Sequence, residues 1–169
     1  EEEFDLLIIA PKTFEDELGR LKTHKEELGL KTKIKIAEEI YEEYDKRDKP
    51  EEIKYYIKDA IENWNVKYLL LVGGLKNIFW AKPRDDNNYG ESGWHIPVRY
   101  TNNHDNPAHP LLASNIKDPG VISDLYYADI YKYNETSGKN EFEDWDPTGD
   151  NIFAAWGLEG AKNDSEIDW

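Results

Sequence analysis

The sequence predicts an α/β fold, with a mainly parallel sheet between two layers of helices in a three-layer α-β-α sandwich. Two observations predict it. Three short segments, at 4–10, 31–37 and 68–74, have strand patterns, and helical patterns lie between them. Strands that alternate with helices along the chain pair in parallel. We therefore expect segment 4–10 to lie between the other two.

The first strand and the helix after it have clear patterns. FDLLIIA, at Phe4–Ala10, is continuously apolar, which is typical of a strand covered on both faces. The next helix has apolar residues near helical spacing, and Gly29 is expected to end it. Thr13 and Asp16 are predicted to pair at its start. Its apolar positions are Phe14, Leu18, Leu21 and Leu28.

The next segments predict an edge strand and a buried helix. KTKIKIA, at 31–37, alternates polar and apolar residues, so it is expected to be half covered and near a sheet edge. AEEIYEEY predicts a short helix, and Asp48 and Pro50 predict the start of a longer one. The longer helix has one apolar stripe that is expected to pack in the core. The stripe consists of Ile53, Tyr56, Ile57, Ala60, Ile61 and Trp64.

YLLLVGG, at Tyr68–Gly74, predicts the third strand, which we expect to be the most buried one. Gly73 and Gly74 allow a sharp turn at its carboxyl end. Binding and catalytic sites of α/β sheets gather at the carboxyl ends of strands. We therefore expect any site near Ala10 and Gly73–Gly74.

The second half is less regular. Residues at about 75–120 are rich in Asn, Asp, Pro and Gly and predict a long irregular insertion, in which WHIPVRY is strand-like. VISDLYYADIY, at 121–131, predicts a further strand. We expect residues 1–169 to form a single α/β domain that includes this insertion.

Composition limits the function classes. The chain has 21 Lys and Arg against 36 Asp and Glu, a net charge of −15, which disfavours nucleic acids and anionic membranes as partners. No apolar run is long enough to cross a bilayer, so no membrane insertion is expected. The sequence contains no Cys, so it holds no thiolate nucleophile. Its four His show no regular metal-ligand spacing.

The stretch DWDPTGDNIFAAW, at 144–156, is the strongest local signal for a site. Calcium prefers hard oxygen ligands from alternating residues of a tight loop. Two frames of the loop supply such ligands, one starting at Asp144 and one at Asp146. The alternative is an Asp-Pro-Thr-Gly turn whose carboxylates cap local amides. The candidate ligands are Asp144, Asp146, Thr148, Asp150 and the carbonyl of Ile152.

Four segments taken in order resemble the gingipain family of cysteine peptidases. These are FDLLIIAPKTFEDELGRLKTHKEELGLKTKI, DKPEEIKYYIKDAIENWNVKYLLLVGG, IPVRY and SDLYYADIY, within positions 4–156. The resemblance is to the amino-terminal part of the catalytic region and implies a caspase-like fold. It also implies a calcium loop near 146–156, from which this chain departs at Asn151, where Gly is usual, and at Ala155, where Glu is usual.

The resemblance places the catalytic His and Cys downstream of the segments matched here, so no catalytic residue is assigned in this chain. We expect a non-catalytic amino-terminal subdomain of a gingipain-like cysteine endopeptidase, inactive alone, that scaffolds a downstream catalytic subdomain. That subdomain should dock at the open sheet edge beside the SDLYYADIY strand. The parent would act on protein or peptide substrates, outside the cell or at its surface, and calcium is the expected cofactor.

The alternative is a stand-alone extracellular module that binds a protein or a carbohydrate and has no peptidase role. Aromatic side chains in the insertion suit stacking on such ligands, although the same residues suit anchoring in a core. They are Trp80, Tyr89, Trp94 and Tyr100.

Overall fold

The structure of the chain, a computed structural model, describes residues 2–77, 91, 93–101 and 121–146. These residues divide into two compact units. The described part of the first unit is 2–77 with 93–97, and that of the second is 91, 98–101 and 121–146. Much of the predicted insertion at about 75–120 lies outside the described residues, so the single-domain organisation stays a prediction.

The first unit is built on a three-stranded parallel sheet with the order β2-β1-β3. The strands are β1 (Leu6–Ala10), β2 (Thr32–Ile36) and β3 (Tyr68–Leu71). Leu6 of β1 lies opposite Thr32 on one side and Tyr68 on the other. The predicted α/β class, the parallel pairing and the central place of the first strand are confirmed.

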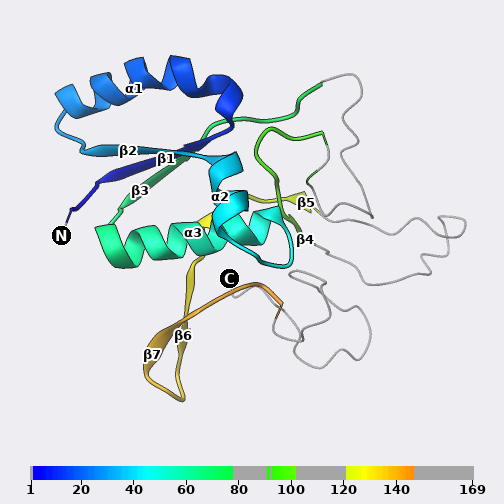
Figure 1. The fold of residues 1–169 in the computed structure, drawn as a ribbon. Helices are drawn as coiled ribbons and strands as arrows, with labels where there is room; N and C mark the ends of the chain where they lie inside the picture. Colours follow the sequence, from blue (N-terminus) through cyan, green and yellow to red (C-terminus); the bar gives the residue numbers. More distant parts are fainter. Residues whose placement is uncertain (1, 78–90, 92, 102–120, 147–169) are drawn as a thin grey trace, which may run out of the picture. The chain divides into compact units, whose positions relative to one another are not determined.

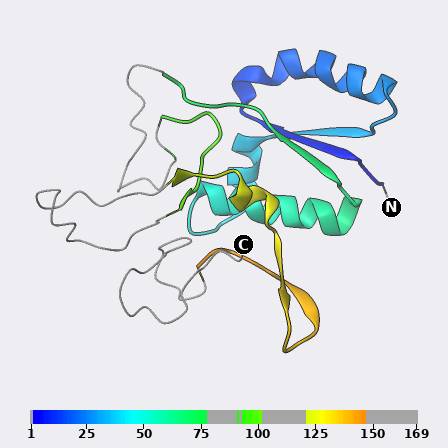
Figure 2. The same cartoon turned by 180° about the vertical axis from the view of Figure 1, so that it is seen from behind.

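Helices lie on both faces of this sheet (Figures 1 and 2). They are the short 3-10 helix η1 (Lys12–Phe14), α1 (Glu15–Glu27), α2 (Ala37–Glu43) and α3 (Lys49–Trp64). On the α1 face, Leu6, Ile8 and Ala10 of β1 pack against Leu18. On the opposite face, the Lys33 and Lys35 side chains of β2 lie over aromatic rings of α3.

The helix ends show which local signals were correct. Asp48 caps α3 as predicted, because its Oδ1 accepts a hydrogen bond from the Glu51 N–H at 3.0 Å. Gly29, at φ +84°, ends α1, and its N–H donates to the Glu26 carbonyl at 2.9 Å. The predicted pairing of Thr13 with Asp16 was wrong, because η1 occupies this position and no side chain caps α1.

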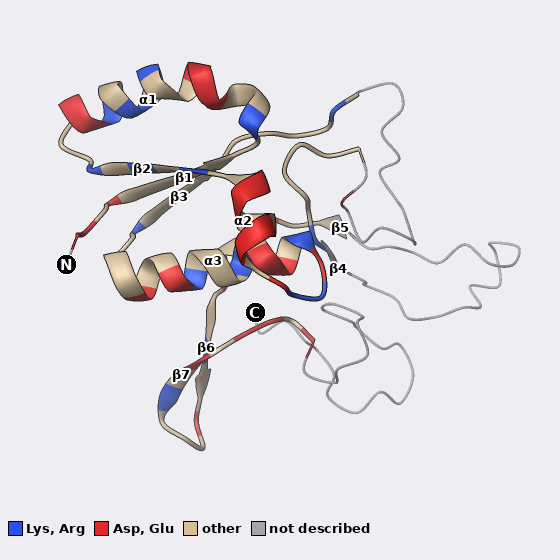
Figure 3. Ribbon diagram, viewed as in Figure 1, with Lys and Arg blue, Asp and Glu red and all other residues tan. Residues whose placement is uncertain are grey.

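The apolar stripe of α3 lies in the core as predicted. Ile53 and Ala60 are completely buried and Ile57 nearly so, while Trp64 is half buried. Acidic residues are concentrated on α2, which Figure 3 shows mainly in red. Two of these, Glu39 and Glu43, form ion pairs with Lys35 at 3.1 and 2.6 Å.

The prediction that the third strand is the most buried was wrong. All five residues of β1 are buried, whereas Tyr68 and Leu70 of β3 are 58% and 36% exposed. The physical reason is position. β1 has a strand on either side, whereas β3 pairs only with β1 among the described strands.

The second unit contains short elements. They are β4 (Tyr100–Thr101), β5 (Val121–Ile122), α4 (Leu125–Ala128), β6 (Tyr131–Asn134) and β7 (Lys139–Phe142). β4 pairs with β5, and β6 with β7, both antiparallel. At the tip of the β6–β7 hairpin the Asn134 side chain accepts hydrogen bonds from the Thr136 and Ser137 N–H groups at 2.8 and 3.1 Å.

The prediction of one strand through VISDLYYADIY was wrong. Tyr126 and Tyr127 are neighbours and both are buried, which a helical turn permits and an alternating strand face does not. The Ser123 Oγ accepts a hydrogen bond from the Leu125 N–H at 3.2 Å where α4 begins. The segment therefore contributes α4 and the start of β6, and it is not a strand of the parallel sheet. The predicted docking edge beside it is wrong for the same reason.

Among the residues that the structure describes, no helix combines the length and the apolar character needed to cross a membrane.

Replacing Asp48 with Ala should lower the free energy of unfolding by about 1 kcal/mol, because the Glu51 N–H loses its acceptor at the first turn of α3. Urea denaturation followed by circular dichroism measures this change. Asp48→Ser, which keeps a capping oxygen, is the control and should recover most of the loss. Equal losses in both variants would show that the cap contributes little.

Candidate functional site

The carboxyl ends of the parallel strands, here called the carboxyl edge of the sheet, are the first place to look for a site, as the sequence predicts. β1 ends at Ala10 and β3 at Leu71, after which the chain continues through Val72 to Gly73 and Gly74. Among the described residues, a segment from the second half of the chain also reaches this edge. That segment is 93–97, which belongs to the first unit.

Segment 93–97 is held at the edge by backbone hydrogen bonds. The Lys76 N–H donates to the Gly93 carbonyl at 2.7 Å, and the His95 N–H donates to the Gly74 carbonyl at 2.9 Å. Leu75 and Trp94 form an antiparallel bridge between these bonds. The two chain segments therefore form a clasp, defined here as residues 73–76 with 93–96.

The clasp brings a half-buried imidazole to the carboxyl edge. The His95 ring lies 5.0 Å from the Phe14 ring, centroid to centroid. Gly73 permits the approach, because it has φ +138° and a Cβ placed on it would lie 2.8 Å from the His95 Cβ. The ring nitrogens of an imidazole donate or accept hydrogen bonds, so His95 can contact a polar ligand here.

Sequence reasoning gave His95 no role. The available signal was a Gly-Gly pair after a buried strand and an apolar-flanked His about twenty residues later, and no periodicity connects the two. His24 is exposed on α1, and His104 and His109 lie outside the described residues.

The acidic loop is described only up to Asp146. Asp144 is half buried, Asp146 is 5% exposed, and the Asp146 N–H donates to Asp144 Oδ1 at 3.1 Å. The other candidate calcium ligands, Thr148, Asp150 and Ile152, lie outside the described residues. Within the described ranges, no three or more His, Asp or Glu residues come together as a potential metal site. The calcium set therefore stays a prediction.

Trp145 ties this loop to the core of the second unit. It is completely buried and has φ +66°, a left-handed conformation that is rare for a bulky residue. Its indole N–H donates to Asp129 Oδ2 at 2.9 Å, and its backbone N–H donates to Glu143 Oε1 at 2.8 Å. These bonds hold the strained residue in place, and with it the two flanking carboxylates.

An aromatic and cationic cluster is centred on Tyr126, which packs against Trp145. The Tyr126 ring packs edge-on against Trp145 at 5.4 Å and against Tyr127 at 5.3 Å. Arg99, only 1% exposed, places its guanidinium 4.6 Å from the Tyr126 ring centre and donates to the Tyr126 hydroxyl at 3.2 Å. Sequence reasoning missed this cluster, because a buried Arg in IPVRY has no periodic signal.

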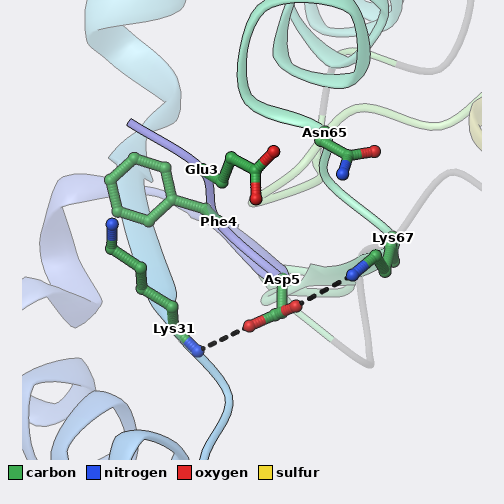
Figure 4. A pocket seen from close by; sticks show the side chains of 6 residues that line it. All are labelled: Glu3, Phe4, Asp5, Lys31, Asn65 and Lys67. Carbon is green, nitrogen blue, oxygen red and sulfur yellow. Dashed lines mark hydrogen bonds and ion pairs between the residues drawn. The ribbon is translucent and has the colours of Figure 1, made fainter. Parts of the chain in front are cut away.

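A polar hollow of about 310 Å³ opens at the amino end of the sheet (Figure 4). Asp5 lies at its centre, where it accepts hydrogen bonds from the Lys31 N–H at 3.0 Å and from Lys67 Nζ at 3.2 Å. The backbone N–H of Lys31, followed by the Lys67 ammonium, lowers the pKa of Asp5 below its usual value. These bonds join the starts of all three strands, so the hollow has a structural role. Its lining residues are Glu3, Phe4, Asp5, Lys31, Asn65 and Lys67.

The aromatic residues proposed for a binding module are only partly described. Trp94 is half buried in the clasp, and Tyr100 belongs to β4 of the second unit. Trp80 and Tyr89 lie outside the described residues. A binding surface formed by these four residues therefore stays a prediction.

Comparison with protein families decides the identity. The model described as Peptidase family C25, the gingipain family, matches residues 1–150, which is most of the chain. The chain belongs to this family. No curated protein and no solved structure matches it. The predicted relationship to the gingipain-like cysteine peptidases is confirmed.

Membership in this family changes how the clasp and the acidic loop are interpreted. A cysteine peptidase needs a thiolate, and the 169 residues of this chain contain no Cys. The nucleophile of a family C25 peptidase is therefore not among these residues. Among the described residues, the clasp, with His95 at the sheet edge, and the start of the acidic loop, held by Trp145, are the candidate sites.

Replacing Gly73 with Ala should disrupt the clasp. The new Cβ would meet His95 at 2.8 Å in a backbone conformation that Ala rarely adopts, a cost on the order of 1–3 kcal/mol. Thermal melting measures the loss, and a shift of the His95 imidazole signals in NMR spectra locates it. Gly74→Ala is the matched control, since a Cβ there meets nothing within 4 Å. Equal effects at both positions would contradict the importance of this contact.

Proposed function

We propose that this chain is a non-catalytic amino-terminal subdomain of a gingipain-like cysteine endopeptidase and scaffolds a cysteine-bearing portion. The observation that carries the proposal is a family match over residues 1–150 in a sequence without Cys. Thiol peptidases need a thiolate, a neighbouring base and an oxyanion hole, and the first of these is missing here. The substrates of the parent peptidase would be proteins or peptides.

The fold supports a scaffolding role. A parallel sheet with α1 and α3 on opposite faces is compatible with the caspase-like sandwich that we propose for the parent. The clasp also leaves the imidazole of His95 at the carboxyl edge, where a neighbouring catalytic portion would need contacts. We further propose an extracellular or cell-surface location, which rests on the family resemblance alone.

The isolated 169-residue chain should hydrolyse no peptide, because it lacks the nucleophile. The test is to read the gene downstream of the Trp169 codon and to assay both the chain alone and the whole gene product on a mixed peptide library. A downstream Cys and His, with cleavage only by the whole product, is the expected result. A gene product without Cys, or cleavage by the 169-residue chain alone, would overturn the proposal.

We also propose that the loop beginning at Asp144 binds calcium. Asp144 and Asp146 offer hard carboxylate oxygens, the ligands that calcium prefers. Trp145 keeps both carboxylates in one turn through its bonds to Asp129 and Glu143. Thr148, Asp150 and the Ile152 carbonyl are the remaining proposed ligands.

Calcium at about 1 mM should raise the thermal midpoint of the chain, because a ligand that binds only the native state stabilises it. Asp146→Asn should abolish the rise, since it removes one charge from the ligand set. Asp45→Asn, at an exposed position in the other unit, is the control and should keep it. An unchanged midpoint in the unsubstituted chain, or the same rise in Asp146→Asn, would favour the plain turn.

A further inference from the structure

The β6–β7 hairpin carries a sequence motif that the proposed function does not use. At its tip, Asn134, Glu135 and Thr136 form the pattern Asn-X-Thr, in which X is not Pro. This pattern is the acceptor for N-linked glycosylation in exported proteins. A second pattern of this kind, Asn-X-Ser at 163–165, lies outside the described residues.

The motif lies where the two strands of the hairpin are joined (Figure 1). β6 ends at Asn134 and β7 begins at Lys139, so the connecting loop consists of residues 135–138. Gly138, at φ +66°, closes the loop, and its N–H donates to the Asn134 carbonyl at 2.8 Å. Every loop residue is exposed and Asn134 is half buried. A bulky hydrophilic group on the Asn134 side chain can therefore extend into water.

Asn134 is held in an Asx turn. Its Oδ1 accepts hydrogen bonds from the Thr136 N–H at 2.8 Å and from the Ser137 N–H at 3.1 Å. Hydrogen bonds to an amide oxygen polarise the amide and make its N–H groups more acidic. The turn therefore favours the loss of a proton from Asn134 Nδ2, the atom to which an N-linked sugar is attached.

The Nδ2 group keeps its own hydrogen bond when one proton is replaced. It donates to Glu141 Oε2 at 2.9 Å, and the Ser137 hydroxyl donates to Glu141 Oε1 at 2.8 Å. These two bonds, that from Asn134 first, lower the pKa of Glu141 below its usual value. A side-chain amide nitrogen has two protons, so one remains for Glu141 after a sugar takes the place of the other.

The Thr136 hydroxyl is not used by the hairpin. Among the described residues it has no hydrogen-bond partner, whereas the neighbouring Ser137 hydroxyl binds Glu141. The acceptor motif requires a hydroxyl at its third position. Because Thr136 is exposed, its hydroxyl is accessible to a transferase.

We propose that Asn134 is an N-glycosylation site, an inference that rests on the proposed location of the protein outside the cell. Asn134 Nδ2 forms a bond to the anomeric carbon of a sugar carried on a lipid-linked phosphate. The bond between this carbon and the phosphate oxygen breaks, and the phosphate leaves with the bonding electron pair. One Nδ2 proton passes to a base of the transferase. The glycan then extends from the tip of the hairpin.

Mass spectrometry of the whole gene product, purified from its native cells, tests the assignment. Trypsin cleaves after Lys132 and Lys139 and releases residues 133–139, YNETSGK, which should carry sugar on Asn134. An exported gene product in which this peptide is bare would overturn the glycosylation proposal and leave the proposed function intact. A gene product that cell fractionation finds only in the cytoplasm would overturn both the proposed location and this inference.

Substitutions made in the native host separate the motif from the fold. Thr136→Ala should reduce the glycan on the 133–139 peptide at least about tenfold, because the motif loses its hydroxyl. The Asx turn remains, since it uses the Thr136 N–H. Thr136→Ser should keep the glycan, and so should Ser137→Ala, the matched control outside the motif. An unchanged glycan in Thr136→Ala would overturn the proposal.

Attachment to a hydroxyl of the same loop is the competing outcome. Fragmentation that leaves the sugar on the peptide locates it directly on Asn134, Thr136 or Ser137, without any substitution. Asn134→Gln should also remove the glycan. A sugar located on either hydroxyl, or one that persists in Asn134→Gln, would be O-linked and would overturn the proposal.

Discussion

The burial of β1 between two parallel neighbours is the constraint on which the first unit depends. All five of its residues are buried, and each of its edges is hydrogen-bonded to another strand. A strand in this position needs apolar side chains on both faces, and α1 and α3 provide the cover. Asp5, just before β1, extends the same constraint, because its carboxylate binds the Lys31 N–H and the Lys67 ammonium where the other two strands begin.

The second unit depends on a different kind of interaction. Its described core is a group of aromatic rings with a buried guanidinium, in which Tyr126 contacts both Trp145 and Arg99. Such a core is held by the geometry of rings and hydrogen bonds more than by apolar periodicity. This packing holds the Trp145 backbone in a left-handed conformation, which is rare for a bulky residue. The same residue connects the described start of the acidic loop, Asp144–Asp146, to this core.

The elements predicted well are those whose signals are local. Asp48 caps α3 and Gly29 ends α1, since a capping oxygen or a positive φ is required within one turn. The prediction of one strand at 121–131 was wrong because a short run of apolar residues fits a helical turn as well as a strand. The exposure of β3 was misjudged for a related reason, since an apolar strand sequence does not tell how many neighbours the strand has.

The sequence by itself determined the α/β class, the order of the three strands, the family and the absence of a thiolate, because periodicity, composition and an ordered series of motifs suffice for these. The tertiary structure decided three further features. It placed His95 at the carboxyl edge, buried Arg99 against Tyr126 and left β3 paired only with β1 among the described strands. Each of these depends on contacts between residues about twenty or more positions apart, or on which neighbour is absent among the described strands. Local propensities do not depend on contacts between residues far apart in the sequence, so only the folded chain could show these three features.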